Sequence, residues 1–224
     1  MKMPENGHRA HGFSSANFLD SDEIIQELNL KGDEVFMDAG CGDGHNAIKV
    51  LEDYNHKGTV YAVDIYDASI EDMETYKQEN NVENLINIEA DITEGIPGVD
   101  DESIDVILMV NVFHGFKASR KLDEAVSELA RIVKNDGKIA IMDYKPWDVP
   151  NGPPTKMRSS PQDLEKLFAN HGLKKTYLNE EIGEDIPEGK SHFLIMFEKE
   201  WLFLIGSLIL SKTFFKLKII KYYF

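Results

Sequence analysis

The chain of 224 residues contains a single cysteine, Cys41. A lone cysteine excludes a disulfide framework and a thiolate metal cluster within one chain, and it fits the reducing environment of the cytoplasm. Long apolar runs are scarce as well: residues 201–211 are uncharged, but these 11 residues fall well short of the roughly 20 that span a bilayer. Residues 1–7 lack the apolar core of a secretory signal. We therefore expect a cytoplasmic protein without a metal site.

Basic residues are also few, with 24 Lys and Arg against 40 Asp and Glu, which gives a net charge of −16. A surface this negative repels phosphate backbones, which leaves small molecules or basic proteins as partners. Of these we expect a small molecule, and no nucleic acid. Residues 201–224 differ, because they carry four lysines and no acids. That tail allows contact with an anionic membrane surface, although a tail without a role in the chemistry is the interpretation we favour. The oligomeric state stays open.

Apolar strand-like runs alternate with helical patterns through most of the sequence, which predicts an α/β fold of parallel strands joined by right-handed crossovers. The last two runs are separated by the short link 180–190, so we expect them to form an antiparallel hairpin. The predicted strands are 35–39, 59–64, 86–90, 104–110, 138–144, 174–179 and 191–198.

Three helices are predicted from the spacing of apolar residues and from a capping pattern. The first opens at Asp20 with Glu23 and buries Ile24, Ile25 and Leu28; the second has a stripe of Leu122, Val126, Leu129 and Val133; the third has a stripe of Leu164, Leu167, Phe168 and His171.

A glycine-rich turn follows the first predicted strand directly. Gly40, Gly42 and Gly44 permit positive φ and close approach of the backbone to a ligand. Glycine loops before a helix often bind phosphates, but this spacing is G-x-G-x-G rather than the dinucleotide pattern G-x-G-x-x-G. Asp38 before the turn and Asp43 inside it would also repel a pyrophosphate. The turn therefore predicts a ligand that carries positive charge at this point.

These residues resemble motif I of the class I S-adenosylmethionine-dependent methyltransferases. The resemblance implies that Gly40, Cys41, Gly42 and Gly44 wrap the methionyl part of the cofactor, S-adenosylmethionine, and that Asp38 faces its amino group. In this resemblance the glycine loop contacts an amino-acid moiety and not a phosphate.

Further signatures of the same family follow in order. Asp64, at the end of the second strand, matches the acid that holds both ribose hydroxyls, and Ile65 comes next. Asp91 and Ile92 match the segment beside the adenine, and Asn111 follows the fourth strand. The resemblance covers about residues 33–198, and it is strongest to the branch of quinone-biosynthesis and methyltransferase-11-type enzymes.

The family resemblance implies a Rossmann-like sheet of seven strands, mostly parallel, with helices on both faces and a C-terminal antiparallel hairpin. It also divides the chain into an N-terminal lid segment and helix (1–32), an S-adenosylmethionine-binding methyltransferase domain (33–200) and the apolar and basic tail (201–224). Residues 7–15 and 145–160 are candidate covers over the acceptor, the latter without evident secondary structure.

The implied reaction is an in-line transfer of a methyl group to a small molecule. His114, just past the fourth strand, is the candidate general base, and Tyr144, which ends the fifth strand, is a candidate for orienting the acceptor. Packing roles remain open for both: His114 against the cofactor, Tyr144 in the core. Two other functions remain open, a non-catalytic cofactor-binding protein and an aminopropyltransferase, although the latter calls for paired acids where Asn111 and His114 stand.

Overall fold

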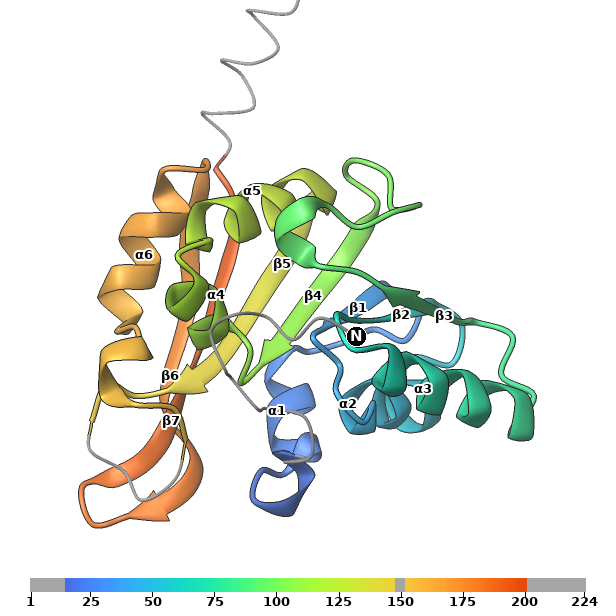
Figure 1. Ribbon diagram of the computed structural model, residues 1–224, viewed down its shortest axis with the longest axis horizontal. Coiled ribbons are helices and arrows are strands. Elements are labelled where there is room, and N and C mark those ends of the chain that lie inside the picture. The colour runs from blue at the N-terminus through green and yellow to red at the C-terminus, as the bar shows by residue number, and fades with distance from the viewer. Residues whose placement is uncertain (1–14, 148–151, 201–224) are drawn as a thin grey trace, which may run out of the picture.

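The computed structural model describes residues 15–147 and 152–200. They form a seven-stranded sheet in the order β3-β2-β1-β4-β5-β7-β6 (Figure 1). The five strands from β3 to β5 are parallel, whereas β7 is antiparallel to both of its neighbours. The predicted fold class is therefore confirmed. The strands are β1 Val35–Ala39, β2 Thr59–Asp64, β3 Leu85–Glu89, β4 Ile104–Val110, β5 Val133–Tyr144, β6 Leu173–Ile186 and β7 Gly189–Lys199.

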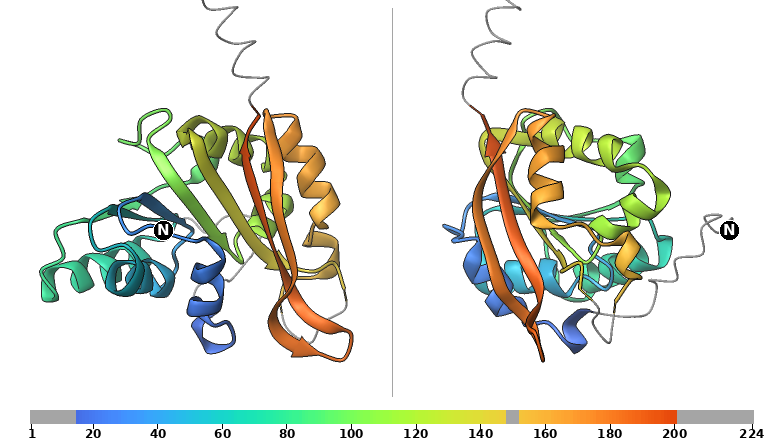
Figure 2. Two further views of the ribbon diagram at one scale, coloured as in Figure 1. Left: turned by 180° about the vertical axis from the view of Figure 1, so that it is seen from behind. Right: turned by 90° about the vertical axis from the view of Figure 1, so that its left-hand side faces the viewer.

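Helices cover both faces of this sheet, with α1, α2 and α3 on one side and α4, α5 and α6 on the other (Figures 1 and 2). The helices are α1 Ser21–Glu27, α2 His45–Lys49, α3 Asp67–Glu79, α4 Phe113–Ser119, α5 Leu122–Ile132 and α6 Pro161–Ala169. The short turns are η1 Ser15–Asn17, the π-helical η2 Val50–Tyr54 that continues α2, η3 Ile92–Glu94 and η4 Thr155–Met157.

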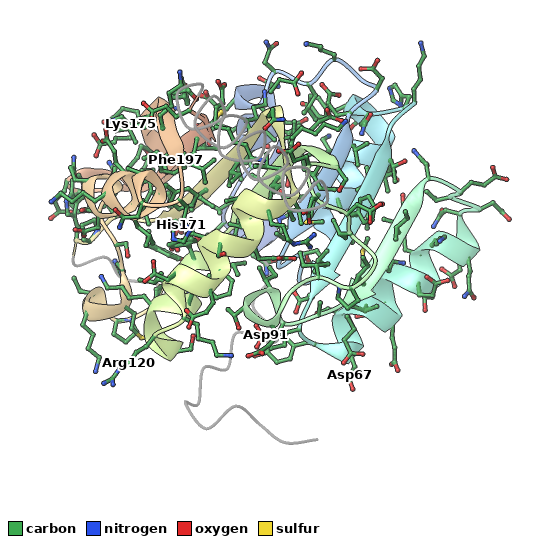
Figure 3. The ribbon with its side chains drawn as sticks, turned by 90° about the horizontal axis from the view of Figure 1, so that it is seen from above. Asp67, Asp91, Arg120, His171, Lys175 and Phe197 are labelled. Carbon is green, nitrogen blue, oxygen red and sulfur yellow. The ribbon has the colours of Figure 1, made fainter. Side chains whose placement is uncertain are left out.

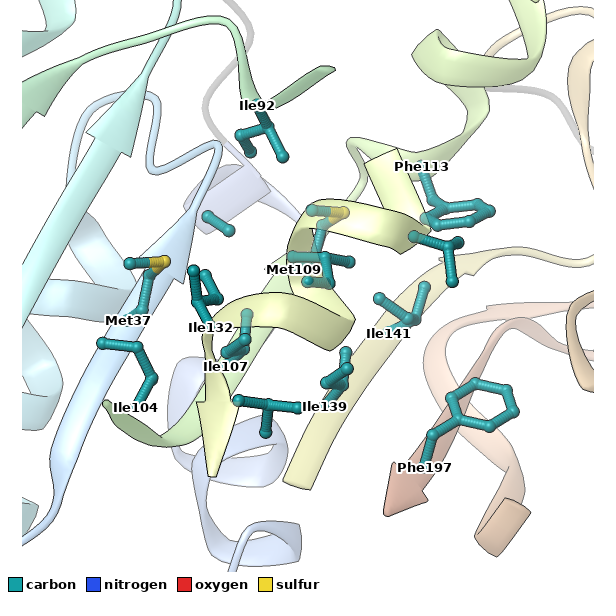
Figure 4. Packing of buried hydrophobic residues seen from close by; sticks show 14 of the residues in the cluster. Met37, Ile92, Ile104, Ile107, Met109, Phe113, Ile132, Ile139, Ile141 and Phe197 are labelled. Carbon is teal, nitrogen blue, oxygen red and sulfur yellow. The ribbon is translucent and has the colours of Figure 1, made fainter. Parts of the chain in front are cut away.

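The core consists of two apolar layers, one on each face of the sheet. Met37, Ile107 and Ile141 face α4–α6 (Figure 4), while Phe36 and Leu108 belong to the layer on the α1–α3 side. Successive residues of a strand point to opposite faces, so burial on both sides produces the continuous apolar runs seen in the sequence. Each fully buried side chain of this size stabilises the fold by about 1.5–3 kcal/mol.

Capping residues fix where the helices on both sides begin. The Asp20 side chain accepts a hydrogen bond from the backbone N–H of Asp22 at 2.9 Å and caps α1, as predicted. Ser160 and Asp163 form a reciprocal capping box at the start of α6, which the sequence analysis did not identify. Each such cap stabilises its helix by about 1 kcal/mol.

Two predicted helical stripes extend too far. Val133 is not helical, because α5 ends at Ile132 and Val133 begins β5, opposite Ile104 of β4. His171 lies beyond the end of α6, and its Nε2 is 3.2 Å from the Asp123 carboxylate of α5. Apolar spacing alone does not reveal where a helix ends and the next strand begins, since both elements contribute apolar residues to the same core.

The C-terminal hairpin is longer than predicted, because most of the supposed link 180–190 belongs to β6 and β7. Strand β6 lies at the edge of the sheet and is largely exposed, so its polar residues hide the strand pattern.

The segment after β5 is organised around one arginine. Nε of Arg158 donates to the carbonyl of Pro153 at 2.7 Å, and Nη1 donates to the carbonyl of Trp147 at 2.6 Å. The segment also contains the turn η4, so the prediction that 145–160 lacks secondary structure is wrong at that point. The tail 201–224 and most of the predicted cover 7–15 lie outside the described residues. Among the residues that are described, no helix is long and apolar enough to cross a bilayer.

Candidate active site

The glycine loop joins the carboxyl end of β1 to α2. Gly40, Gly42 and Gly44 all have positive φ, at 84°, 55° and 78°. A Cβ on Gly40 would overlap the Val112 side chain, and one on Gly44 would overlap the Met73 sulfur. A Cβ on Gly42 would meet no atom within 4 Å. The outer glycines therefore allow close packing within the protein, whereas Gly42 faces open space.

Asp38 is the next-to-last residue of β1, just before this loop. It is 1% exposed, and its Oδ2 accepts a hydrogen bond from the backbone N–H of Ala47 in α2 at 3.1 Å. Burial raises the pKa of Asp38 to about 7, against the opposing effect of nearby His45. The imidazole of His45 is itself held by Asp43, with Nδ1 2.6 Å from Oδ1. A cationic group that reached Asp38 would stabilise the ionised carboxylate.

Asp64 ties the glycine loop to the carboxyl end of β2. Its Oδ2 accepts a hydrogen bond from the Gly42 backbone N–H at 2.8 Å, and its Oδ1 accepts one from the Tyr66 N–H at 3.0 Å. Each carboxylate oxygen has a second lone pair for a ligand. The neighbouring Ile65 is 48% exposed, which is unusual for a large apolar side chain.

Asp91 lies at the same edge of the molecule as Asp67, the first residue of α3 (Figure 3). Its Oδ1 accepts hydrogen bonds from the Thr93 backbone N–H at 2.9 Å and from the Thr93 hydroxyl at 2.6 Å, so it caps η3. The ammonium of Lys121 is 3.7 Å from Oδ2. Ile92, which follows, is buried against the core. The carboxylate of Asp91 is thus used mainly by its own chain.

His114 lies in the first turn of α4, where it pairs with Asp143 of β5. Its Nδ1 is 2.9 Å from Asp143 Oδ1, and its backbone N–H donates to Asp143 Oδ2 at 2.9 Å. Both side chains are buried. In the neutral ring, contact with a carboxylate favours the tautomer that has its proton on Nδ1 and its lone pair on Nε2. The sequence analysis missed Asp143, although it ends an apolar strand in the same way as Asp38 and Asp64.

A second buried group joins the ends of β4 and β7. His192 Nε2 donates to Asn111 Oδ1 at 3.1 Å, and the Ser191 hydroxyl donates to His192 Nδ1 at 2.6 Å. Burial lowers the pKa of His192 to about 4, so the ring is neutral at physiological pH. Tyr144 is buried with its ring centroid 4.1 Å from that of His192, and burial raises its pKa to about 12. No local pattern in the sequence pointed to His192.

Cys41 packs inside the glycine loop. It is buried, and burial raises the pKa of its thiol, so it remains protonated. Within the described residues, no group of three or more His, Cys, Asp or Glu side chains has the arrangement of a metal site.

The comparison with protein families settles the class. The model of a family described as "Methyltransferase domain" matches residues 30–199. The chain belongs to this family. S-Adenosylmethionine is the cofactor of this methyltransferase domain, and the resemblance seen in motif I is confirmed.

Curated relatives match about half of this chain. "Uncharacterized methyltransferase YcgJ" of Bacillus subtilis is 31% identical over 126 residues, which are 56% of this chain and 47% of the relative. The tRNA(Thr) (cytosine(32)-N(3))-methyltransferase of Saccharomyces cerevisiae is 28% identical over 120 residues, 50% of this chain and 18% of the relative. The chain thus spans less than half the length of each of these relatives.

Solved structures share the fold of the methyltransferase domain. A SAM-dependent methyltransferase from Aquifex aeolicus has a TM-score of 0.70 at 22% identity and covers 84% of this chain and 93% of its own. A type 11 methyltransferase from Sulfolobus solfataricus, described as putative, has a TM-score of 0.60 at 22% identity and covers 82% of this chain and 94% of its own.

Proposed function

We propose that this protein transfers the methyl group of S-adenosylmethionine to a small-molecule acceptor at the carboxyl edge of its sheet. The observation that carries the proposal is the hydrogen bond from the Gly42 N–H to Asp64. It joins the open glycine loop after β1 to the acid at the end of β2, so that both face one ligand. When bound, the cofactor supplies a methyl group made electrophilic by a sulfonium.

The residues at this edge fit the cofactor. Asp64 accepts hydrogen bonds from the two ribose hydroxyls through its remaining lone pairs, and the exposed Ile65 packs against the adenine. Gly42 offers room for the methionyl part, and the buried Asp38 attracts its ammonium.

The flanking residues complete the proposed cofactor site. The backbone of Gly40, Cys41 and Gly44 shapes the loop, while Asp91 and Ile92 border the adenine end, with Asp91 acting mainly through the turn that it caps. Asn111, which follows β4, borders the methionyl end where the cofactor would meet the acceptor.

Cofactor affinity is expected to depend on pH through Asp38. Because the pKa of this buried carboxyl lies at about 7 in the free protein, the group is largely protonated below pH 7 and attracts the ammonium only after losing its proton. Binding should therefore be about tenfold weaker at pH 6 than at pH 8. Isothermal titration calorimetry across this range tests the expectation. The Asp38→Asn variant should bind the cofactor weakly and with little pH dependence, whereas the His45→Gln variant should retain the pH dependence. If the pH dependence were lost only in His45→Gln, Asp38 would not be the group that titrates.

Two glycine substitutions should separate folding from cofactor binding. Gly44→Ala is expected to lower the free energy of unfolding by about 2–4 kcal/mol, because its Cβ overlaps the buried Met73 and its φ is positive. Gly42→Ala should lower the free energy of unfolding by less, because only the strain of its positive φ applies. It should nevertheless weaken cofactor binding, since its Cβ enters the open space of the loop. Thermal unfolding and calorimetric titration measure the two effects. Equal losses of affinity in both variants, corrected for unfolded protein, would contradict this division.

The pair of His114 and Asp143 is proposed as the general base. Asp143 holds the Nδ1 proton, so Nε2 would take a proton from an acceptor hydroxyl as its oxygen attacks the methyl carbon, or from an acceptor ammonium before its nitrogen attacks. The bond between the methyl carbon and sulfur breaks in the same displacement, and the sulfur leaves as a neutral thioether. Tyr144, packed on His192, forms part of the wall that orients the acceptor.

A small acceptor is supported by the net charge of −16, which repels nucleic acids. The names of two relatives point the other way, since the yeast protein and mouse METTL2 are both named as tRNA methyltransferases. The proposed arrangement keeps residues 33–200 as the methyltransferase domain, preceded by the lid segment 1–32 and followed by the tail 201–224.

Incubation with methyl-labelled cofactor tests the whole proposal. The protein is offered a metabolite extract and, separately, bulk tRNA; label in a small molecule is the expected result. Label in tRNA would overturn the acceptor class. Cofactor binding without any transfer would favour a non-catalytic binding protein, and turnover of decarboxylated cofactor with a polyamine would favour aminopropyl transfer.

A further inference from the structure

The acidic side chain at the end of β5 is already bonded within the protein. The Asp143 carboxylate accepts hydrogen bonds from the His114 N–H and the Tyr144 N–H and contacts His114 Nδ1. Among the described residues, Glu184 of β6 also acts on this region, since its charge raises the pKa of Tyr144. A donor that has no partner among these residues can be satisfied by acceptor atoms of a ligand.

Lys145 is one such donor. It is 2% exposed and follows Tyr144 at the end of β5, with its backbone N–H bound to the Ser191 carbonyl at 3.0 Å. Its ammonium lies 4.3 Å from the centroid of the Trp147 ring, and within the described part of the chain it has no hydrogen-bond acceptor. The cation–π contact stabilises this ammonium by about 0.5–2 kcal/mol, and an anion beside it would stabilise it further.

Asn111 supplies the second donor. Its Oδ1 is fixed by the neutral His192, which turns Nδ2 toward a position where, among the described residues, no partner exists. The residue also has a φ of 58°, a conformation that a non-glycine residue adopts at a cost and that clusters at functional sites. The amide is thus held in place, with an N–H group that a ligand must satisfy.

Both donors belong to residues held beside the end of β7, since the Asn111 side chain bonds to His192 and the Lys145 backbone N–H bonds to the carbonyl of the preceding residue, Ser191. His192 bonds to Asn111, and its pKa is lowered in part by the positive charges of Lys145 and Arg158. Arg158 is itself buried, and its Cζ lies 5.2 Å from the centroid of the Tyr144 ring. A chain with a net charge of −16 thus gathers positive charge on the acceptor side of its sheet.

We infer that the methyl acceptor carries an anionic oxygen group, such as a carboxylate or a phosphate, bound by the ammonium of Lys145 and the amide N–H of Asn111. This inference rests on the proposed methyl transfer and names the class of its acceptor. The cofactor side of the sheet presents carboxylates, and the acceptor side presents donors, so the two ligands are distinguished by charge.

The test uses the full chain and a metabolite extract divided by anion exchange at pH 7 into acidic and non-acidic fractions. Each is incubated with methyl-labelled cofactor, and a phosphatase-treated portion of the acidic fraction separates phosphates from carboxylates. Label is expected in the acidic fraction. With that fraction as substrate, Lys145→Met should raise the apparent KM about 10- to 100-fold and leave the cofactor Kd unchanged. Lys145→Arg, which keeps the charge, should stay within a few-fold of the unmodified protein.

The matched control is Lys166→Met, the same substitution at an exposed position of α6. Asn111→Asp keeps the oxygen that binds His192, tolerates positive φ and removes the donor, so it should raise the acceptor KM at least as much as Lys145→Met. Label confined to the non-acidic fraction, or equal KM values in Lys145→Met and Lys166→Met, would overturn the inference while methyl transfer stands. An absence of label in every fraction would overturn the proposed function itself.

Discussion

Replacing Asp64 with alanine is expected to weaken binding of S-adenosylmethionine roughly 100- to 10,000-fold. A hydrogen bond to a charged group contributes about 1.5–3 kcal/mol, and Asp64 would lose two of them to the ribose. The same change removes the acceptor for the Gly42 and Tyr66 N–H groups, which loosens the glycine loop. Calorimetric titration of the cofactor into the folded variant measures the loss directly.

Asp72→Ala provides the matched control for this prediction, because Asp72 is exposed on the neighbouring helix α3 and loses the same carboxylate. The cofactor affinity of Asp64→Asn should lie between those of Asp64→Ala and Asp72→Ala. The amide keeps one acceptor oxygen but directs an N–H group at one of the former donors. If Asp64→Ala bound the cofactor as tightly as Asp72→Ala, the ribose assignment would be wrong, and with it the observation on which the proposed function rests.

Asp143→Asn is expected to lower kcat for methyl transfer about 100- to 10,000-fold while leaving the cofactor Kd nearly unchanged. The carboxylate now keeps the proton of His114 on Nδ1. An amide N–H2 group facing Nδ1 favours the opposite tautomer, in which Nε2 holds the proton and cannot accept one. A positioned general base contributes about this factor to the rate. The change is measured as single-turnover rates across a range of pH, with methyl-labelled cofactor and the acceptor that becomes labelled.

The chain contains a second pair of the same chemistry for comparison. His171 and Asp123 approach to 3.2 Å at the surface, where the Asp123 side chain is mostly exposed. Asp123→Asn should leave kcat and its pH profile unaltered, whereas His114→Ala should match Asp143→Asn. A rate in Asp143→Asn equal to that in Asp123→Asn would mean that the acceptor reaches the site already deprotonated and that the buried pair has a structural role.

Much of the proposed cofactor side was predicted from local sequence. Asp38 and Asp64 each end an apolar run, and the glycines stand within six residues of Asp38, so one short stretch carries both the strand and its loop. Parallel strands then bring their carboxyl ends to one edge, which is why Gly42 and Asp64 meet although 22 residues separate them.

The acceptor side did not follow in the same way. His114 and Asp143 are 29 residues apart, and Asn111 and His192 are 81 apart. Each pair meets because β4, β5 and β7 are neighbours in the sheet and because α4 turns His114 back toward β5. Nothing in the spacing of these residues signals such contacts. The single signal available was the acid at the end of β5, which repeats the pattern of β1 and β2.

The sequence by itself determined the parallel sheet, the glycine turn and the acids of the proposed cofactor side, because these depend on residues close together in the chain. Only the tertiary structure decided which side chains of the acceptor side are paired, which are neutral and which lack a partner. Burial and pairing depend on strand order, and β7 enters between β5 and β6 at a point that sequence distance does not reveal. The charge of the acceptor is therefore inferred from the folded protein, while the charge of the cofactor could be inferred from the glycine turn.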